Sequence, residues 1–140
     1  MKLLLFCCLV VLGWRASEGF GRKQRISVKG EVFCPSKASD AYNIKVKLVD
    51  EDDGPDPDDL MAEGYTDTSG RFNLQGEESE WTNIDPRVKI YHDCNDGLKP
   101  CQRKWKITIP DKYINKGVFD MGRLNLEMIM DEEERDCLHK

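Results

Sequence analysis

Apolar and polar residues alternate with a period of two along most of the chain, which is the pattern of half-buried β-strands. The clearest run covers residues 44–48, where Ile44, Val46 and Leu48 alternate with lysines. The other strands are expected at residues 26–34, 60–66, 71–74, 88–94, 104–109 and 123–130. The last run would also suit a helix by composition, but it is short and follows a glycine, which favours a strand. The pattern therefore predicts an all-β fold, an antiparallel β-sandwich of about seven strands.

The N-terminal segment has the three-part layout of a secretory signal peptide. A lysine at position 2 precedes an apolar run over residues 3–12, and small residues follow at 16–19. The apolar run is about half of the roughly 20 residues that a membrane-spanning helix needs, so we expect no membrane span. We predict a signal peptide at residues 1–19 and one secreted, extracellular domain at residues 20–140.

Four cysteines remain once Cys7 and Cys8 leave with the signal peptide. An even number of cysteines in an oxidising compartment indicates disulfides, and four cysteines allow three pairings. Two of them flank a turn between adjacent predicted strands, so we expect Cys94 to pair with Cys101 and Cys34 to pair with Cys137. The spacing lacks the close cysteine pairs of structural zinc sites. We therefore predict two disulfides, no metal and no cofactor.

The charge of the chain changes sign locally. Without residues 1–19, the 21 basic and 26 acidic residues fall to 19 and 25, a net charge of −6, which opposes nucleic-acid binding. Residues 87–106, by contrast, hold six basic and two acidic side chains. Alternation places several of them on the outward face of one hairpin, a candidate site for an anionic surface. The alternative is a sheet face whose lysines are simply solvated. The candidate residues are Arg87, Lys89, Tyr91, Lys99, Arg103, Lys104 and Lys106.

Two further features are candidates for a metal site or a catalytic group. Residues 50–59 contain seven carboxylates, the ligand type that calcium prefers, but their spacing does not match an EF-hand loop. Repulsion between like charges favours carboxylates splayed into solvent. His92 lies on the predicted inward face of its strand, where a single histidine is usually a hydrogen-bonded core residue.

Several segments, taken in their order along the chain, resemble the nematode transthyretin-like family. They are Val28-Lys29-Gly30 with Cys34, then residues 46–50, 53–60, 63–67, 70–72, 84–86, 90–94 and 99–103. The resemblance implies a transthyretin-like (prealbumin-like) sandwich and an extracellular location. It also implies recognition of cell-surface components, including exposed anionic phospholipid.

These observations lead to three hypotheses of function. The first is a secreted binding module whose partner is a cell-surface or extracellular protein or an anionic lipid. The second is a carrier of a small apolar ligand. The third is a hydrolase related to 5-hydroxyisourate hydrolase, which needs a Tyr-Arg-Gly-Ser end, whereas this chain ends Asp-Cys-Leu-His-Lys. No Gly-x-Ser-x-Gly or His-Glu-x-x-His motif occurs, and we expect no enzymatic activity.

Overall fold

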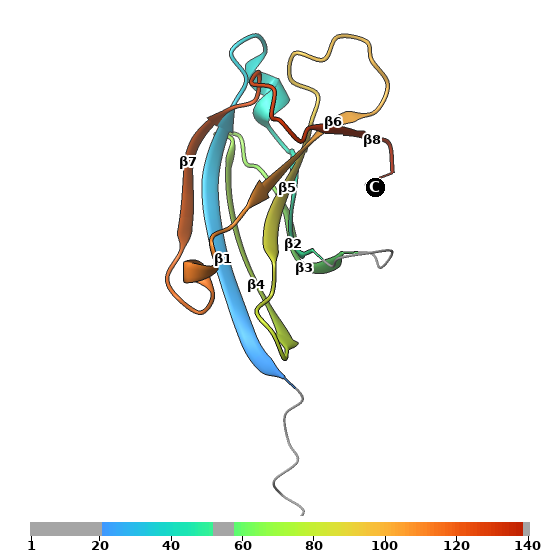
Figure 1. Ribbon diagram of the computed structural model, residues 1–140. Coiled ribbons are helices and arrows are strands. Elements are labelled where there is room, and N and C mark those ends of the chain that lie inside the picture. Colours follow the sequence, from blue (N-terminus) through green and yellow to red (C-terminus); the bar gives the residue numbers. More distant parts are fainter. Residues whose placement is uncertain (1–20, 52–57, 139–140) are drawn as a thin grey trace, which may run out of the picture.

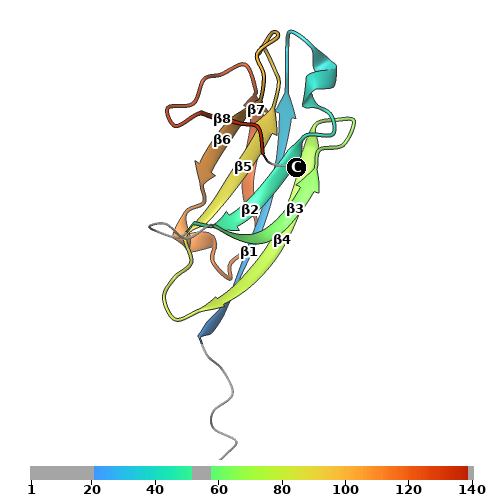
Figure 2. The same cartoon turned by 90° about the vertical axis from the view of Figure 1, so that its right-hand side faces the viewer.

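The computed structural model describes residues 21–51 and 58–138. Two sheets with strand orders β4-β1-β7 and β3-β2-β5-β6-β8 pack as the two layers of a sandwich, visible in Figures 1 and 2. The all-β sandwich predicted from the sequence is confirmed. Its elements are β1 (Arg22–Phe33), η2 (Ala38–Ala41), β2 (Lys45–Asp50), β3 (Asp59–Tyr65), β4 (Arg71–Glu80), β5 (Pro86–His92), β6 (Gln102–Thr108), η3 (Asp111–Tyr113), β7 (Phe119–Asn125) and β8 (Glu134–Asp136).

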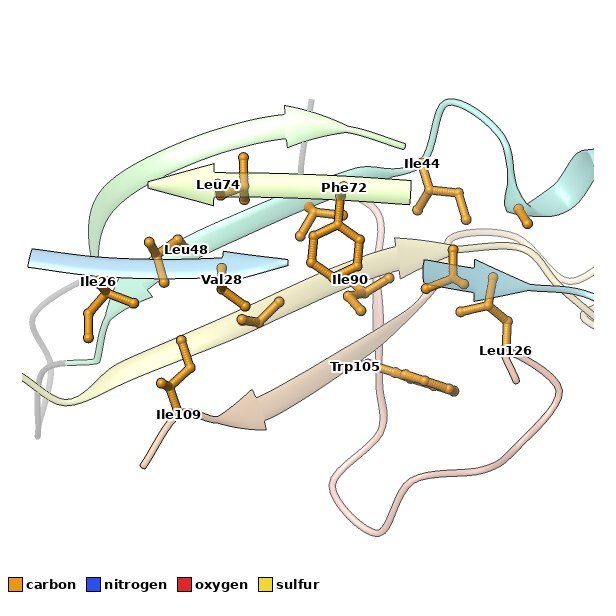
Figure 3. Close-up of a cluster of buried hydrophobic side chains, with 14 of the residues drawn as sticks. Ile26, Val28, Ile44, Leu48, Phe72, Leu74, Ile90, Trp105, Ile109 and Leu126 are labelled. Atoms are coloured by element: carbon orange, nitrogen blue, oxygen red, sulfur yellow. The ribbon is translucent and has the colours of Figure 1, made fainter. Parts of the chain in front are cut away.

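The core lies between the sheets and follows the alternation of the strands, as Figure 3 shows. Ile26 and Val28 of β1 face inward from one sheet, and Leu48 and Ile90 face them from the other. Trp105 of β6 is the largest fully buried side chain. Burial of each such side chain contributes about 1.5–3 kcal/mol to the free energy of folding. A shift of one residue would turn these side chains to the solvent, so the register of the central strands is strongly specified.

Several strand boundaries differ from the expected ones, most clearly in β4 and β7. β4 continues to Glu80 through residues expected to form a loop, because it pairs with the first residues of β1, beginning with Arg22 opposite Glu80. The expected strand at 123–130 ends at Asn125, whose side-chain oxygen accepts the Glu127 N–H in a turn. One strand pairing, that of β1 with β7, is parallel.

A short eighth strand, β8, lies beyond the last strand expected from the sequence, and it pairs with β6. Within the described ranges, no helix is long and apolar enough to cross a membrane. The predicted signal peptide at residues 1–19 and the centre of the acidic run, residues 52–57, lie outside the described residues.

All four cysteines that were expected to form disulfides do so, but the pairing predicted from the sequence is wrong. The bonds are Cys34–Cys94 and Cys101–Cys137, with sequence separations of 60 and 36 residues. Neither bond closes the β5–β6 hairpin.

The first bond forms because the hairpin opens before it reaches its cysteines. The β5–β6 ladder ends at the pair His92 and Arg103. Cys94 then keeps the inward direction of its strand and is buried against Cys34, which follows β1.

The second bond follows from the register of β8. Gln102 of β6 is paired with Asp136 of β8 in an antiparallel ladder. The next residues outward along that ladder are Cys101 and Cys137, so the bond fastens the C-terminal segment to the edge of the sheet.

Candidate binding face

The outer face of the five-stranded sheet, opposite the core, gathers basic side chains from three neighbouring strands. Lys89 of β5 stands between Lys47 of β2 and Lys106 of β6, and Tyr91 stands opposite Lys104. We call Lys47, Arg87, Lys89, Lys104 and Lys106 the cationic face. The sequence had already indicated four of these five residues. Lys47 was missed as a site residue, although the alternation of residues 44–48 placed it on the same face.

Carboxylates from the two ends of the acidic run neutralise one half of the cationic face. Lys106 donates a hydrogen bond to Glu51 at 2.7 Å, and a second oxygen of Glu51 lies 2.5 Å from the Arg87 guanidinium. Lys89 donates to Asp58 at 2.6 Å. The hydrogen bond to Glu51 raises the pKa of Lys106, so this ammonium stays charged and paired.

Carboxylates of β8 neutralise the other half. The ammonium group of Lys104 lies 3.4 Å from Glu134 and 3.8 Å from Asp136. The side chains of the paired basic residues are only 12–21 % exposed. The face therefore presents a network of ion pairs with nearly balanced charge, rather than the excess of four positive charges counted along residues 87–106.

Tyr91 lies beneath this network and is almost fully buried. The ammonium of Lys47 sits 5.3 Å from the centre of its ring, a cation–π contact. Burial, together with the nearby charges of Asp136 and Asp58, raises the pKa of Tyr91 to about 12. The phenol is therefore neutral at pH 7, and the face of its ring contacts the ammonium of Lys47.

Two of the candidate residues do not belong to the cationic face. Arg103 has its guanidinium on the core side, because its register partner His92 also faces inward, and it is 4 % exposed. Its expected role in surface binding is therefore wrong. Lys99 is exposed in the loop between β5 and β6.

A shallow groove of about 370 Å³ opens at the η2 end of the outer face. Its lining is mostly polar and includes Asp40, Tyr42, Lys45, Tyr65 and Gln102. The ammonium of Lys45 lies 3.5 Å from Glu63 and is buried beside Tyr65. The groove is therefore suited to polar groups that can replace water hydrogen bonds.

His92 is a core residue, as its place in the alternation predicted. Its Nδ1 accepts a hydrogen bond from the Cys94 N–H at 3.1 Å, and its ring packs edge-on against Trp105 at 5.3 Å. Burial, reinforced by the charge of Arg103, lowers its pKa from 6.5 to about 4. The imidazole is therefore neutral at pH 7.

This shift predicts acid sensitivity. Because the folded state lowers the pKa of His92, its contribution to stability is present above pH 6.5 and is lost as the pH falls towards 4. We expect the free energy of unfolding of the wild type to fall by up to about 3 kcal/mol relative to His92→Gln between these pH values. Glutamine keeps an acceptor for the Cys94 N–H but takes up no proton. Urea unfolding of both proteins at pH 7, 5.5 and 4 measures the difference, and parallel pH profiles would contradict the prediction.

Comparison with known proteins agrees with this architecture. Residues 29–110 match the model of the transthyretin-like family. Transthyretin-like protein 5 of Caenorhabditis elegans is 47 % identical over 99 % of this chain and 100 % of its own length. Transthyretin-like protein 33 of the same animal is 48 % identical over 84 % of each chain, and transthyretin-like protein 46 is 46 % identical over 99 % of this chain and 78 % of its own. The chain therefore belongs to the transthyretin-like family.

Proposed function

We propose that the protein is a secreted, non-enzymatic binding module that recognises an extracellular or cell-surface protein through the outer face of its five-stranded sheet. The observation that carries the proposal is the cationic face itself. It is a set of charged side chains held in register on β2, β5 and β6, which are the three central strands of their sheet (Figure 1). These side chains lie on the face of the sheet that is opposite the core. Rigid strands hold a recognition surface in a defined geometry, so little ordering is needed when a partner binds.

Secretion is supported by the disulfides and by the N-terminal sequence. Two disulfides in a small domain are typical of oxidising compartments outside the cytosol. Residues 1–19 have the layout of a signal peptide. We therefore place the site of action outside the cell.

The balance of charge favours a protein partner over an anionic membrane. Each basic side chain of the β5–β6 hairpin on this face already contacts a carboxylate of Glu51, Asp58, Glu134 or Asp136. A uniformly anionic surface would meet these carboxylates and be repelled by them. A protein surface with charges of both signs can complement both members of the ion pairs, which gives specificity.

The other two hypotheses receive less support. The groove on the outer face is lined mainly by polar residues, which does not suit a carrier of apolar ligands. His92 is buried and neutral, and the nearby Cys94 is consumed in a disulfide, so this pair cannot form a nucleophile and general base.

The proposal predicts that neutralising the face weakens binding. We expect the triple variant Lys89→Gln, Lys104→Gln, Lys106→Gln to bind nematode cells and tissue about tenfold more weakly than wild type. A loss of about 0.5 kcal/mol of binding free energy at each of the three lysines corresponds to that factor. Glutamine is chosen because a glutamate would oppose the carboxylates already in place. Binding of fluorescently labelled protein is measured by titration at low and physiological salt.

The opposite sheet provides a matched control. Lys29, Arg71 and Arg123 are exposed cations of the three-stranded sheet, and each also contacts a carboxylate. Changing these three to glutamine alters the net charge equally and should leave binding unchanged. Equal losses in both triple variants would show that the face is not the contact.

A separate measurement tests the lipid alternative. Wild type is sedimented with vesicles of phosphatidylcholine alone and with vesicles that also contain phosphatidylserine. We expect no difference between the two at physiological salt. Binding to the anionic vesicles alone, weakened by salt and by the cationic-face variant, would replace the protein partner with a membrane.

A further inference from the structure

Four carboxylates converge at one end of the sandwich, on a part of the molecule that the cationic face does not use. Asp50 is the last residue of β2 and is paired with Asp59, the first residue of β3. Glu78 and Glu80 are two residues apart on β4, so they point to the same side of that strand. Each of the four residues offers one oxygen, and these oxygens all lie within 4.8 Å of one another.

Two of the carboxylates have buried oxygens without a hydrogen-bond partner. Asp50 is 2 % exposed, and its Oδ1 accepts a hydrogen bond from the Asp85 N–H at 2.8 Å. Its other oxygen, Oδ2, has no partner, and neither does the buried Oε2 of Glu78. An unpaired buried carboxylate oxygen is costly, so the arrangement calls for a positive charge or a proton between these groups.

Among residues 21–51 and 58–138, no lysine or arginine forms an ion pair with Asp50, Asp59 or Glu78. Repulsion between carboxylates spaced this closely is relieved when a divalent cation lies among them.

We propose that Asp50, Asp59, Glu78 and Glu80 form a calcium site. The donor set consists of carboxylate oxygens alone, which selects a hard cation over zinc or copper. Calcium accepts six to eight oxygens in flexible geometry, and four carboxylates that bind through one or both oxygens can supply most of them. Magnesium requires a stricter octahedron and gives up its water less readily.

The site would tie together elements from both sheets. Asp50 and Asp59 come from the five-stranded sheet, whereas Glu78 and Glu80 come from the three-stranded sheet. A bound ion would therefore join β2 and β3 to β4 at this end of the sandwich. Among residues 21–51 and 58–138, none of Asp50, Asp59 and Glu78 forms an ion pair with a residue of the cationic face, so the calcium site does not depend on the proposed binding face.

The test compares the protein with and without calcium. Extracellular modules bind calcium with dissociation constants of about 10⁻⁴–10⁻³ M. We therefore expect 10 mM CaCl₂ to raise the ratio of folded to unfolded wild type by about 10- to 100-fold over chelator-treated protein. Urea unfolding measures the ratio, and calorimetric titration with CaCl₂ measures the affinity and the number of sites. MgCl₂ at the same ionic strength should give a smaller effect.

Single variants locate the ion. Glu78→Gln and Asp59→Asn should each weaken calcium binding at least tenfold, and Asp59 is exposed, so its variant should fold normally. Glu77→Gln is the matched control on the same strand, because Glu77 faces the other side of β4, where it lies 3.8 Å from Arg25. This control should retain the full response to calcium.

Three results would overturn the proposal. If calcium leaves wild type unchanged, the carboxylates hold a proton, and Glu78→Gln should then be as stable as wild type or more stable. If Glu77→Gln and Glu78→Gln lose the response equally, calcium binds diffusely to an acidic surface. If neither Glu78→Gln nor Asp59→Asn weakens binding, the ion sits elsewhere.

Discussion

Replacing Arg103 with alanine is expected to lower the free energy of unfolding by about 3–5 kcal/mol. The guanidinium is buried and donates hydrogen bonds to the backbone carbonyls of Cys94 and Leu126 at 2.8 Å and of Met128 at 2.7 Å. It also forms a forked contact with Glu133, the shortest distance being 2.6 Å. Alanine would remove the donor to these three carbonyls and would leave the partly buried Glu133 carboxylate without its countercharge.

The contact between Arg103 and Glu133 also fixes the position of the segment between β7 and β8. Its carboxylate also accepts the indole N–H of Trp105 at 2.8 Å. Burial raises the pKa of Glu133, but the hydrogen bonds from Arg103 and Trp105 outweigh it and lower the pKa overall. The arginine therefore holds the segment between β7 and β8 against the core strand β6.

The neighbouring residue is the matched control for this prediction. Lys104 lies on the opposite face of β6, where its partners are the carboxylates of β8. Lys104→Ala should lower the free energy of unfolding by at most about 1 kcal/mol, because its partner Glu134 is largely exposed and solvent-screened ion pairs contribute little. Urea unfolding measures both variants. A loss below 1 kcal/mol for Arg103→Ala would contradict a structural role and make this residue a candidate for surface binding again.

Removing the Cys34–Cys94 bond is expected to cost about 4 kcal/mol. The chain-entropy relation gives this value for the 60-residue separation of the two cysteines. Both cysteines are also buried in the core, so their loss leaves part of the space between the sheets less well filled. The double variant Cys34→Ala, Cys94→Ala should therefore unfold at a clearly lower urea concentration.

Counting free thiols in the same variants tests the pairing itself. The variant without Cys34 and Cys94 should contain no free thiol, since Cys101 and Cys137 remain bonded to each other. A variant that replaces Cys94 and Cys101 by alanine should contain two, because each remaining cysteine has lost its partner. Two free thiols in the first variant and none in the second would instead support the pairing of Cys94 with Cys101 that the sequence suggested.

The strands and their faces were predictable because they depend on local periodicity. Val88, Ile90 and His92 all face inward, and Lys89 and Tyr91 face outward, as the alternation requires. The same rule fails where the chain leaves the ladder. Asn125 ends β7 with a side-chain hydrogen bond to the backbone, which competes with the strand and is invisible to a count of apolar residues.

Arg103 is the clearest case of a residue whose role the sequence left ambiguous. The alternation of β6 places it on the same side as Trp105, yet its charge led us to group it with the surface lysines. Its partners are three backbone carbonyls and a carboxylate 30 residues away. A buried arginine can be recognised only when all these acceptors are seen to converge on it.

By itself, the sequence determined the all-β class, the inward and outward faces of the strands, the cysteines that form disulfides and the family. Each of these depends on residue type and on spacing of a few residues. Only the tertiary structure decided which cysteines pair, which carboxylates neutralise the cationic face and which carboxylates converge at the candidate calcium site. Asp50 and Glu78, for example, are neighbours because two sheets pack together, and the energy of such contacts depends on distance in space, which separation along the chain does not specify.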